Sequence, residues 1–333
     1  MRRSNPTTTV DYHHHKRSKN SLTAKYELYT GEKLNWLQVT FRVEMVVFPV
    51  IIPWVIACGM YGVFISLLYN SGYPVAFSDQ TAVLTNAVLS FNIGFTLLLV
   101  FRTNTAHQRF WEGRERWGAL VNTVRNLAQG IYITVKENSP QARIKKEAMA
   151  RLVVAFAVAM KLHLRAKPLD NQLATLMSDI QYFKLKDTQH PPLQIAYWIR
   201  EYLQEQYECN CLNVFQLSDL HKLVDDLIDI LGGCERILRT PLPLIYTIKL
   251  RQLLLIFCLL LPLEIVSTLN WWTGLVMACV SFTLLSIEEI GSEIEEPFGC
   301  DPNDLPLNMI CNKIQQNVEE LIALAPSKEY DWR

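Results

Sequence analysis

Residues 45–69, MVVFPVIIPWVIACGMYGVFISLLY, contain no Asp, Glu, Lys or Arg. A second uncharged stretch follows at residues 80–101, QTAVLTNAVLSFNIGFTLLLVF. A helix needs roughly 20 residues to cross about 30 Å of hydrocarbon, and each stretch is longer than that. The turn-rich linker NSGYPVAFSD separates the two. The sequence therefore predicts a hairpin of two membrane-spanning helices over residues 45–101.

A second pair of apolar stretches lies near the C-terminus. Residues 252–269 read QLLLIFCLLLPLEIVSTL and residues 271–287 read WWTGLVMACVSFTLLSI. Pro262 and Glu264 interrupt the first of these, and an ionisable residue at membrane depth normally faces protein or water. Thr240 followed by Pro241 is typical of a helix N-cap and first position. We predict a second transmembrane hairpin over residues 241–290.

The composition indicates a membrane part joined to a sizeable soluble part. The chain has 333 residues, 32 Lys and Arg against 32 Asp and Glu, and a mean hydropathy of +0.10. This value is too high for an ordinary soluble enzyme and too low for a chain that lies wholly in lipid. The zero net charge lacks the basic footprint of a nucleic-acid-binding protein. We expect membrane lipid and no nucleic acid among the partners.

The segment between the hairpins, residues 102–240, is too long for a loop and is predicted to be a helical region. Residues 142–166 repeat apolar side chains at three- and four-residue spacing, and residues 193–207 follow the breaker Pro191-Pro192. A third helix is predicted to start at the cap Ser218-Asp219 and to end at Gly232-Gly233. No strand pattern is present. The predicted fold is all-α: a polytopic membrane protein with four transmembrane helices, a cytoplasmic helical region and a C-terminal segment, residues 291–333.

Lys and Arg residues predict the orientation in the membrane. They are frequent before the first hairpin, after it and ahead of the second, whereas the two hairpin tips carry only Asp79. The positive-inside rule then places both termini and residues 102–240 on the cytoplasmic side, or the stromal side of a thylakoid-type membrane. The polar, basic tail, residues 1–35, has no apolar core typical of a cleavable signal peptide. His13, His14 and His15 in that tail could bind a metal, but a solvated tail touching anionic lipid is favoured.

The sequence carries no motif of a known catalytic site. It has no G-x-S-x-G, Walker A, G-x-G-x-x-G or H-E-x-x-H pattern. The lone pair Cys209 and Cys211 lacks a second pair at zinc-site spacing. The remaining histidines have no Cys or carboxylate at ligand spacing: His107, His163, His190 and His221. We therefore predict that the chain is not an enzyme and needs no cofactor.

Three ordered blocks resemble the bestrophin family, especially its bacterial and plant-type branch. They are LLLVFRTNTAHQRFWEGRERWGALVNTVRNLA at residues 97–128, GGCERILRTPLPLIYTIKLRQ at 232–252 and EEPFGCDPNDLPLN at 295–308. The likeness covers residues 36–324. It implies an all-helical ion channel, typically anion-selective, assembled as a homopentamer around one central pore. We expect passive conduction of small monovalent anions, with chloride first and bicarbonate as a further candidate.

The resemblance also implies a hydrophobic pore neck of three residues one helical turn apart. The last of them lies eight residues before the Arg-aromatic-Trp motif, here Arg109-Phe110-Trp111. Counting back gives Phe101, Leu97 and Ile93. The spacing i, i+4, i+8 places them on one helix face over about 12 Å of rise. Five copies would form stacked apolar rings, which can gate by dewetting. Without the resemblance, the same face would be assigned to lipid or protein contact.

A second, cytoplasmic constriction is implied 28 residues before the first proline of the Pro-Leu-x-Tyr-Thr block. Ungapped counting from Pro243 reaches Phe215, with Leu217 and Leu212 as the alternatives. A buried core phenylalanine is the competing interpretation of Phe215.

The acidic stretch at residues 288–306 offers a candidate cation site. Asp301, Asp304 and neighbouring backbone oxygens could bind a hard cation such as Ca²⁺, although the spacing is not that of an EF-hand. A solvated helix end followed by turns is the favoured interpretation of this stretch. Calcium-activated animal bestrophins carry an unbroken acidic run after Pro-Phe-Gly, and this sequence has Cys-Asp-Pro-Asn-Asp at residues 300–304. Only two carboxylates are retained, so calcium gating is not expected.

Selectivity and the class of function have alternatives. Four arginines after the neck could raise the local anion concentration, or they could be paired within the helical bundle or reflect the membrane topology: Arg102, Arg109, Arg114 and Arg116. The rivals to an anion channel are a cation-permeable channel of the same fold, a non-conducting membrane scaffold and a membrane-bound enzyme.

Overall fold

The computed structural model describes residues 36–76, 82–137, 139–301 and 303–324, with side chains from Phe48 in the first range and from Ser90 in the second. All regular secondary structure within these ranges is helical, which confirms the predicted all-α fold. The predicted tail, including His13 to His15, lies outside the described residues.

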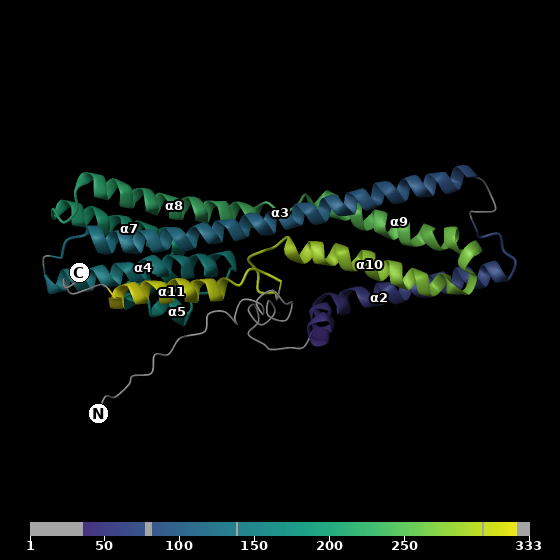
Figure 1. Ribbon diagram of the computed structural model, residues 1–333, viewed down its shortest axis with the longest axis horizontal. Coiled ribbons are helices and arrows are strands. Elements are labelled where there is room, and N and C mark those ends of the chain that lie inside the picture. The colour runs from purple at the N-terminus through teal and green to yellow at the C-terminus, as the bar shows by residue number, and fades with distance from the viewer. Residues whose placement is uncertain (1–35, 77–81, 138, 302, 325–333) are drawn as a thin grey trace, which may run out of the picture. The chain divides into compact units, whose positions relative to one another are not determined.

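The helices follow one another along the chain with short connections (Figure 1). They are α2 (Trp36–Asn70), α3 (Ala82–Thr134), α4 (Pro140–Leu164), α5 (Asn171–Ala174), α6 (Asp179–Lys186), α7 (Pro191–Glu208), α8 (Val214–Arg239), α9 (Leu244–Leu269), the 3-10 helix η2 (Asn270–Trp272), α10 (Thr273–Ile294) and α11 (Leu307–Leu324). The chain divides into two compact units, Met1–Asn92 with Leu254–Ile290 and Ile93–Leu253 with Gly291–Arg333. The division falls inside α3, α9 and α10, so the domain limits predicted at residues 101 and 241 do not coincide with it.

Apolar helices of membrane-spanning length occur where the hairpins are predicted. Phe48–Asn70 and Leu244–Ile294 are long and apolar enough to cross a bilayer, and the second range contains both α9 and α10. Helix α2 continues through Pro49 and Pro53, and α9 continues through Pro262. α3 begins at Ala82 and continues without a break far beyond the predicted span, to Thr134. One helix therefore joins the predicted membrane segment to the predicted cytoplasmic region.

In the first unit, α2 and α10 approach each other through glycines. A Cβ added at Gly62 would lie 3.0 Å from the Cα of Gly274, and a Cβ added at Gly274 would lie 2.4 Å from Cγ2 of Val63. Small residues at such crossings let helix backbones approach closely in a membrane, where van der Waals packing drives association. The glycines therefore set the distance between the two helices.

The turn between α9 and α10 is tied to the end of α2. Asn270 has φ of 48°, in the left-handed region that Asn tolerates well. Its backbone oxygen accepts a hydrogen bond from Oγ of Ser66 at 2.9 Å, and its side chain accepts one from Nδ2 of Asn70 at 2.6 Å. Trp271 and Trp272, predicted at this turn, lie in η2 and are exposed.

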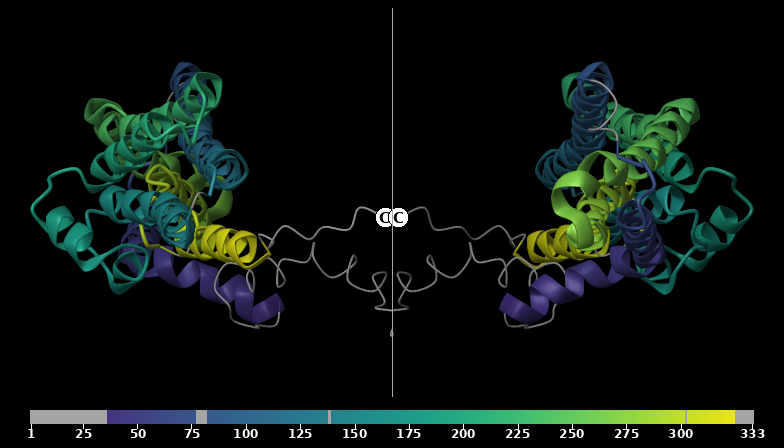
Figure 2. Two further views of the ribbon diagram at one scale, coloured as in Figure 1. Left: turned by 90° about the vertical axis from the view of Figure 1, so that its left-hand side faces the viewer. Right: turned by 90° about the vertical axis from the view of Figure 1, so that its right-hand side faces the viewer.

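The second unit is a helical bundle with a large apolar core. α4 packs against α7 and α11, and α7 packs against α8 (Figures 1 and 2). α4 is buried over almost its whole second half, because apolar residues occur on all its faces from Leu152 to Leu162. Residues of α3 from Trp117 to Ile131 complete the core. The four-residue helix α5 and the short α6 lie beside α4 and α7.

Two helix boundaries differ from those predicted. α8 begins at Val214, because Asn213 and Gln216 form a capping box, and not at Ser218-Asp219. It continues through Gly232 and Gly233 to Arg239, and Thr240 is its C-cap rather than the N-cap of the next helix. α9 begins only at Leu244, after two prolines. The glycines are tolerated because the buried face of α8 continues beyond them with Cys234 and Ile237.

Candidate functional site

The three residues predicted as a pore neck lie on an uncovered face of α3. Ile93, Leu97 and Phe101 are 68%, 53% and 53% exposed. On the opposite side of the same helix, Phe95 and Leu99 are buried, at 2% and 4%. The helix therefore presents an apolar stripe that no described part of the same chain covers.

The uncovered face changes character along the helix. One and two turns beyond Phe101 it continues with Asn104 and Gln108, both exposed. Asparagine and glutamine side chains both donate and accept hydrogen bonds, so this part of the face can bind water. The apolar stretch therefore ends near Phe101 and is followed by a polar stretch.

Hydrogen bonds from the opposite side fix α3. The hydroxyl of Tyr246 donates to the backbone oxygen of Leu98 at 3.1 Å. Nη1 of the buried Arg102 lies 3.3 Å from Oγ1 of Thr247 and 3.5 Å from Oε2 of Glu295. A buried charge must be paired, so this contact determines how α3 is rotated about its axis.

The arginines that follow the predicted neck residues mostly have partners. The Arg109 guanidinium donates to the backbone oxygens of Ile237 (2.6 Å), Thr240 and Glu295 (3.2 Å). Arg116 lies 3.8 Å from Glu112, one turn away. Arg114 is exposed. Arg102 and Arg109 are thus paired within the bundle, and Arg116 is paired within α3.

Phe215 lies in the first turn of α8 with its side chain 78% exposed. The two alternatives for the cytoplasmic constriction, Leu212 and Leu217, are 5% and 9% exposed and belong to the apolar core. The capping box of Asn213 and Gln216 fixes the start of the helix and hence the direction of Phe215. Of the three candidates, Phe215 is the one that the bundle leaves uncovered.

The candidate cation site at Asp301 and Asp304 is a closed loop. The Asp301 backbone N–H donates to Oδ2 of Asp304 at 2.6 Å, and the Asp304 N–H donates back to the Asp301 carbonyl at 3.0 Å. Burial raises the pKa of the Asp304 carboxyl to about 6. The Asp301 side chain is exposed. Asp304 is 5% exposed and its Oδ2 already accepts the Asp301 N–H, so its carboxyl serves the loop itself and these residues do not fit a calcium ion.

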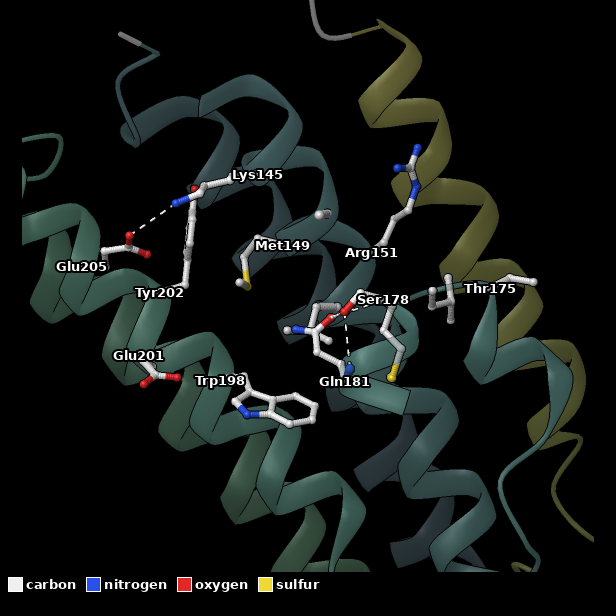
Figure 3. Close-up of a pocket in the computed structure, with 14 residues that line it drawn as sticks. Lys145, Met149, Arg151, Thr175, Ser178, Gln181, Trp198, Glu201, Tyr202 and Glu205 are labelled. Atoms are coloured by element: carbon white, nitrogen blue, oxygen red, sulfur yellow. Dashed lines mark hydrogen bonds and ion pairs between the residues drawn. The ribbon is translucent and has the colours of Figure 1, made fainter. Parts of the chain in front are cut away.

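The bundle contains a cavity of about 490 Å³ that the sequence does not indicate (Figure 3). Trp198, Tyr202 and Met149 supply apolar surface, and Lys145 and Glu205 form an ion pair at its edge, 3.4 Å apart. The positive and negative charges of the side chains that line the cavity largely cancel. The cavity contains none of the predicted pore residues.

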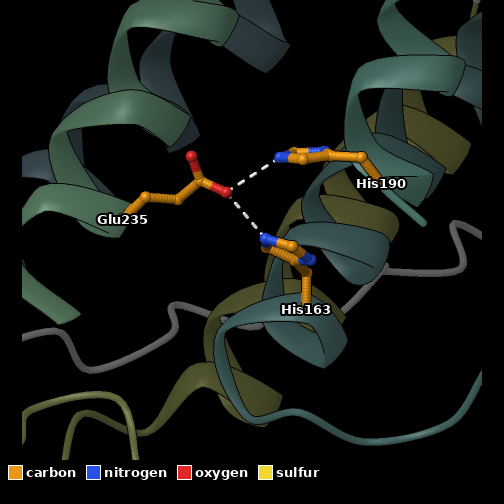
Figure 4. Close-up of side chains that lie close together, drawn as sticks. All are labelled: His163, His190 and Glu235. Carbon is orange, nitrogen blue, oxygen red and sulfur yellow. Dashed lines mark hydrogen bonds and ion pairs between the residues drawn. The ribbon is translucent and has the colours of Figure 1, made fainter. Parts of the chain in front are cut away.

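Two histidines and a glutamate that look unrelated in the sequence lie together. His163 and His190 both contact Oε1 of Glu235, at 2.7 and 2.8 Å (Figure 4). They are 72 and 45 residues from Glu235, so no local spacing could indicate them. The described cysteines carry free thiols, with Cys209 exposed and Cys211 buried.

Comparison with known proteins places these observations in a family. The family described as Bacterial/Fungal Bestrophin protein matches residues 29–320. A protein of Nostoc sp. named as a voltage-dependent anion channel-forming protein is 51% identical, covering 90% of this chain and 95% of the relative. A protein of the same name from Synechocystis sp. is 47% identical, covering 87% and 93%. A crystal structure of a bacterial bestrophin homologue from Klebsiella pneumoniae superposes with a TM-score of 0.73 at 26% identity, covering 82% of this chain and 98% of that one.

Proposed function

Because the chain belongs to the bacterial and fungal bestrophin family, we propose that it is a passive membrane channel for small monovalent anions, chloride first. Ions then move down their gradient, and the transport requires neither a catalytic residue nor a cofactor. The anion channel is preferred over a cation channel and over a non-conducting scaffold because relatives that match nearly their whole length are named anion channel-forming proteins.

The uncovered apolar stripe of α3 is the observation that carries the proposal. A face with Ile93, Leu97 and Phe101 more than half exposed needs a partner or lipid. In a homopentamer with α3 around the axis, each residue would contribute to one of three apolar rings about 6 Å apart. Apolar side chains cannot take the place of the water molecules bound to an ion, so such rings favour ions that lose water easily. The rings can also close the pore by dewetting. Asn104 and Gln108 would then line the wider, wet part of the path.

Phe215 is assigned to a second constriction of the same path. Its ring is exposed on the first turn of α8, whereas its neighbours Leu212 and Leu217 are used by the core. An exposed aromatic ring in a position fixed by a capping box is expensive to leave in water unless another surface covers it. Five such rings around the axis would narrow the cytoplasmic end of the pore.

The membrane orientation follows from the charges. Both termini and the helical bundle are assigned to the cytoplasmic or stromal side, because Lys and Arg gather there and are absent from the hairpin tips. The proposal has three parts: the pentamer, this orientation and the lining residues. Each part can be tested and contradicted independently of the other two.

The first test is the reversal potential of purified protein in a planar bilayer under a KCl gradient. A potential near that of chloride supports the anion channel. A potential near that of potassium contradicts the proposed selectivity. A silent bilayer formed from a confirmed pentamer contradicts the open, passive channel.

The second test uses matched alanine variants. Leu97→Ala removes an apolar neck residue that is 53% exposed, and Leu259→Ala removes an equally exposed leucine from α9. We expect Leu97→Ala to change single-channel conductance or the ratio of chloride to larger-anion permeability, and Leu259→Ala to leave both as in the wild type. Equal effects of the two variants would remove Leu97 from the pore.

A further inference from the structure

Three side chains that belong to α4, to α8 and to the residue before α7 meet in the bundle, and none of them is a proposed pore residue. His163 is in the last turn of α4, His190 immediately precedes α7, and Glu235 is on α8 (Figure 4). One ligand atom of each lies within 4.8 Å of the others. The imidazole rings are tilted by 34° with their centroids 4.4 Å apart. This is a convergence of metal-ligand groups and not merely a surface cluster of charges.

The donor set corresponds to one that zinc uses. Two imidazole nitrogens and one carboxylate bind Zn²⁺ in sites that leave a fourth position for water. Zinc binds these donors at about 2.0–2.2 Å, which places them roughly 3.3 Å apart. The Glu235 oxygen is now 2.7 and 2.8 Å from the two Nε2 atoms. Admitting an ion therefore requires each contact to lengthen by about 0.5 Å, within reach of small side-chain rotations.

The position of His190 frees its side chain for such a role. His190 is the N-cap residue of α7. At this position the side chain of Ser, Thr, Asp or Asn normally accepts a hydrogen bond from a backbone N–H of the first turn, but the His190 side chain makes no such bond. The next two residues, Pro191 and Pro192, have no N–H to be capped. The helix thus begins without using this side chain, which instead faces Glu235.

The surroundings allow an ion to enter and stay. The three side chains are only 19%, 30% and 20% exposed, for His163, His190 and Glu235 in that order. A cavity of about 450 Å³ is lined by His163 and by both neighbours of His190 in the chain, Gln189 and Pro191.

Nearby cations oppose metal binding. Nη2 of Arg239 lies 3.9 Å from Oε1 of Glu235, but its side chain is 72% exposed and can turn into solvent. Lys167 and Lys186 line the adjacent cavity. These charges weaken the attraction for a divalent ion without occupying any of the three ligand atoms.

We propose that His163, His190 and Glu235 form a binding site for a divalent transition metal of the zinc class, which clamps α4, α7 and α8 together. The site is independent of the anion pathway. Its ligands come from elements that are already packed in the same bundle, so the ion would add stability without requiring the fold to rearrange.

The test is metal binding by the full-length, detergent-purified protein after removal of metal with a chelator. Cobalt(II) is the probe, because its visible absorption reports four-coordinate binding by nitrogen and oxygen ligands. The variants His163→Gln and His190→Gln keep a hydrogen-bond donor for Glu235 and remove the imidazole. We expect wild type to bind a single cobalt ion per chain at this site, and both variants to lose the band and that ion.

Controls separate this site from other histidines. His221→Gln alters a histidine on α8 outside the cluster, and a variant with alanine at His13, His14 and His15 removes the histidine run of the tail. Both should retain the cobalt band. Zinc should raise the Tm of wild type and of both controls, and leave the Tm of His163→Gln unchanged. Equal cobalt spectra and equal zinc-induced shifts in wild type and both cluster variants would overturn the proposal.

A charge variant gives an independent check. Arg239→Ala removes the competing cation and keeps all three ligands, so zinc should bind it at least as tightly as wild type in a calorimetric titration. Weaker binding by Arg239→Ala would contradict the assignment of Glu235 as a ligand. Anion conductance plays no part in these readouts, so failure of the channel proposal does not affect them.

Discussion

The Asp304 carboxyl group is buried, so its ionised form is destabilised. It is 5% exposed, and its Oδ2 receives one backbone hydrogen bond from Asp301. Burial raises its pKa from 3.8 to about 6. The folded chain therefore holds this proton more tightly than the unfolded chain does.

The stability of the protein should depend on this proton. The contribution of Asp304 is complete below about pH 4 and is lost as the pH rises through about 6. We expect wild type to lose more stability between pH 5 and pH 7.5 than Asp304→Asn, which keeps an oxygen acceptor for the Asp301 N–H but does not titrate. Thermal unfolding at several pH values measures the difference, and parallel curves for the two proteins would contradict it.

Arg109 joins the ends of two helices through its planar guanidinium. It donates to two backbone oxygens at the end of α8 and to one just after α10. A lysine ammonium cannot reproduce this fork geometry. Arg109→Lys should therefore lower the free energy of unfolding by about 1–3 kcal/mol.

The matched control is Arg114→Lys on the same helix, where the arginine is exposed. Arg114→Lys should change the free energy of unfolding by no more than about 0.5 kcal/mol, as an ordinary surface substitution does. Denaturant or thermal unfolding of the two variants side by side checks the prediction. A similar decrease in the free energy of unfolding for both variants would mean that the contacts of Arg109 with the backbone carbonyls contribute little to stability.

At the scale of helices, α2 and α10 can cross at a short distance only because the glycines at the crossing have no side chains. A Cβ at Gly274 would meet Cγ2 of Val63 at 2.4 Å and the backbone oxygen of Gly59 at 3.1 Å. Gly274→Ala must push the helices apart, which should cost about 1–3 kcal/mol. We expect a lower Tm and a smaller fraction of the protein eluting as a single species in size-exclusion chromatography.

Gly232→Ala is the opposite case on α8. Nothing lies within 4 Å of a Cβ added there, and the residue is exposed inside a helix. Replacing it should stabilise the protein by about 0.5–1 kcal/mol, because glycine loses more conformational freedom on folding than alanine does. A Tm that falls in both variants would show that helix glycines matter here for some reason other than packing distance.

The sequence predicted the helices whose signal is local. Uncharged stretches predicted the apolar helices that the structure has within Phe48–Asn70 and Leu244–Ile294, and apolar spacing identified α4 and α7 to within a few residues. The ends of α8 were missed because two cap signals competed. Ser218-Asp219 and Gly232-Gly233 both look like helix limits, but the buried face extends past each of them. Packing against the core outweighs a cap preference of about 1 kcal/mol.

The candidate site was predictable to a different degree. The proposed neck and the proposed role of Phe215 rest on resemblance to known blocks, and spacing alone assigns the neck residues to lipid or protein contact. The roles of Arg102 and Arg109 needed the structure, because their partners lie more than 100 residues away. The same holds for the histidine pair and Glu235.

For the whole molecule, the orientation in the membrane can be measured with thiols. Ser71 lies at the predicted external tip after α2, and Cys209 lies between α7 and α8; both are exposed. In a chain with serine at Cys279 and Cys300, a membrane-impermeant maleimide should label Ser71→Cys in intact cells. Cys209 should be labelled only after permeabilisation. Labelling of Cys209 in intact cells would reverse the proposed topology.

The position of α11 has a consequence for how the protein is made. Its residues Leu307, Cys311, Ile314 and Val318 are buried in the same core as α4, which the ribosome completes much earlier. The second membrane hairpin is synthesised between the two. The translocation machinery must therefore insert that hairpin while the bundle still exposes an apolar groove on α4. A nascent chain stalled before residue 307 would leave that apolar groove uncovered and open to chaperones and proteases.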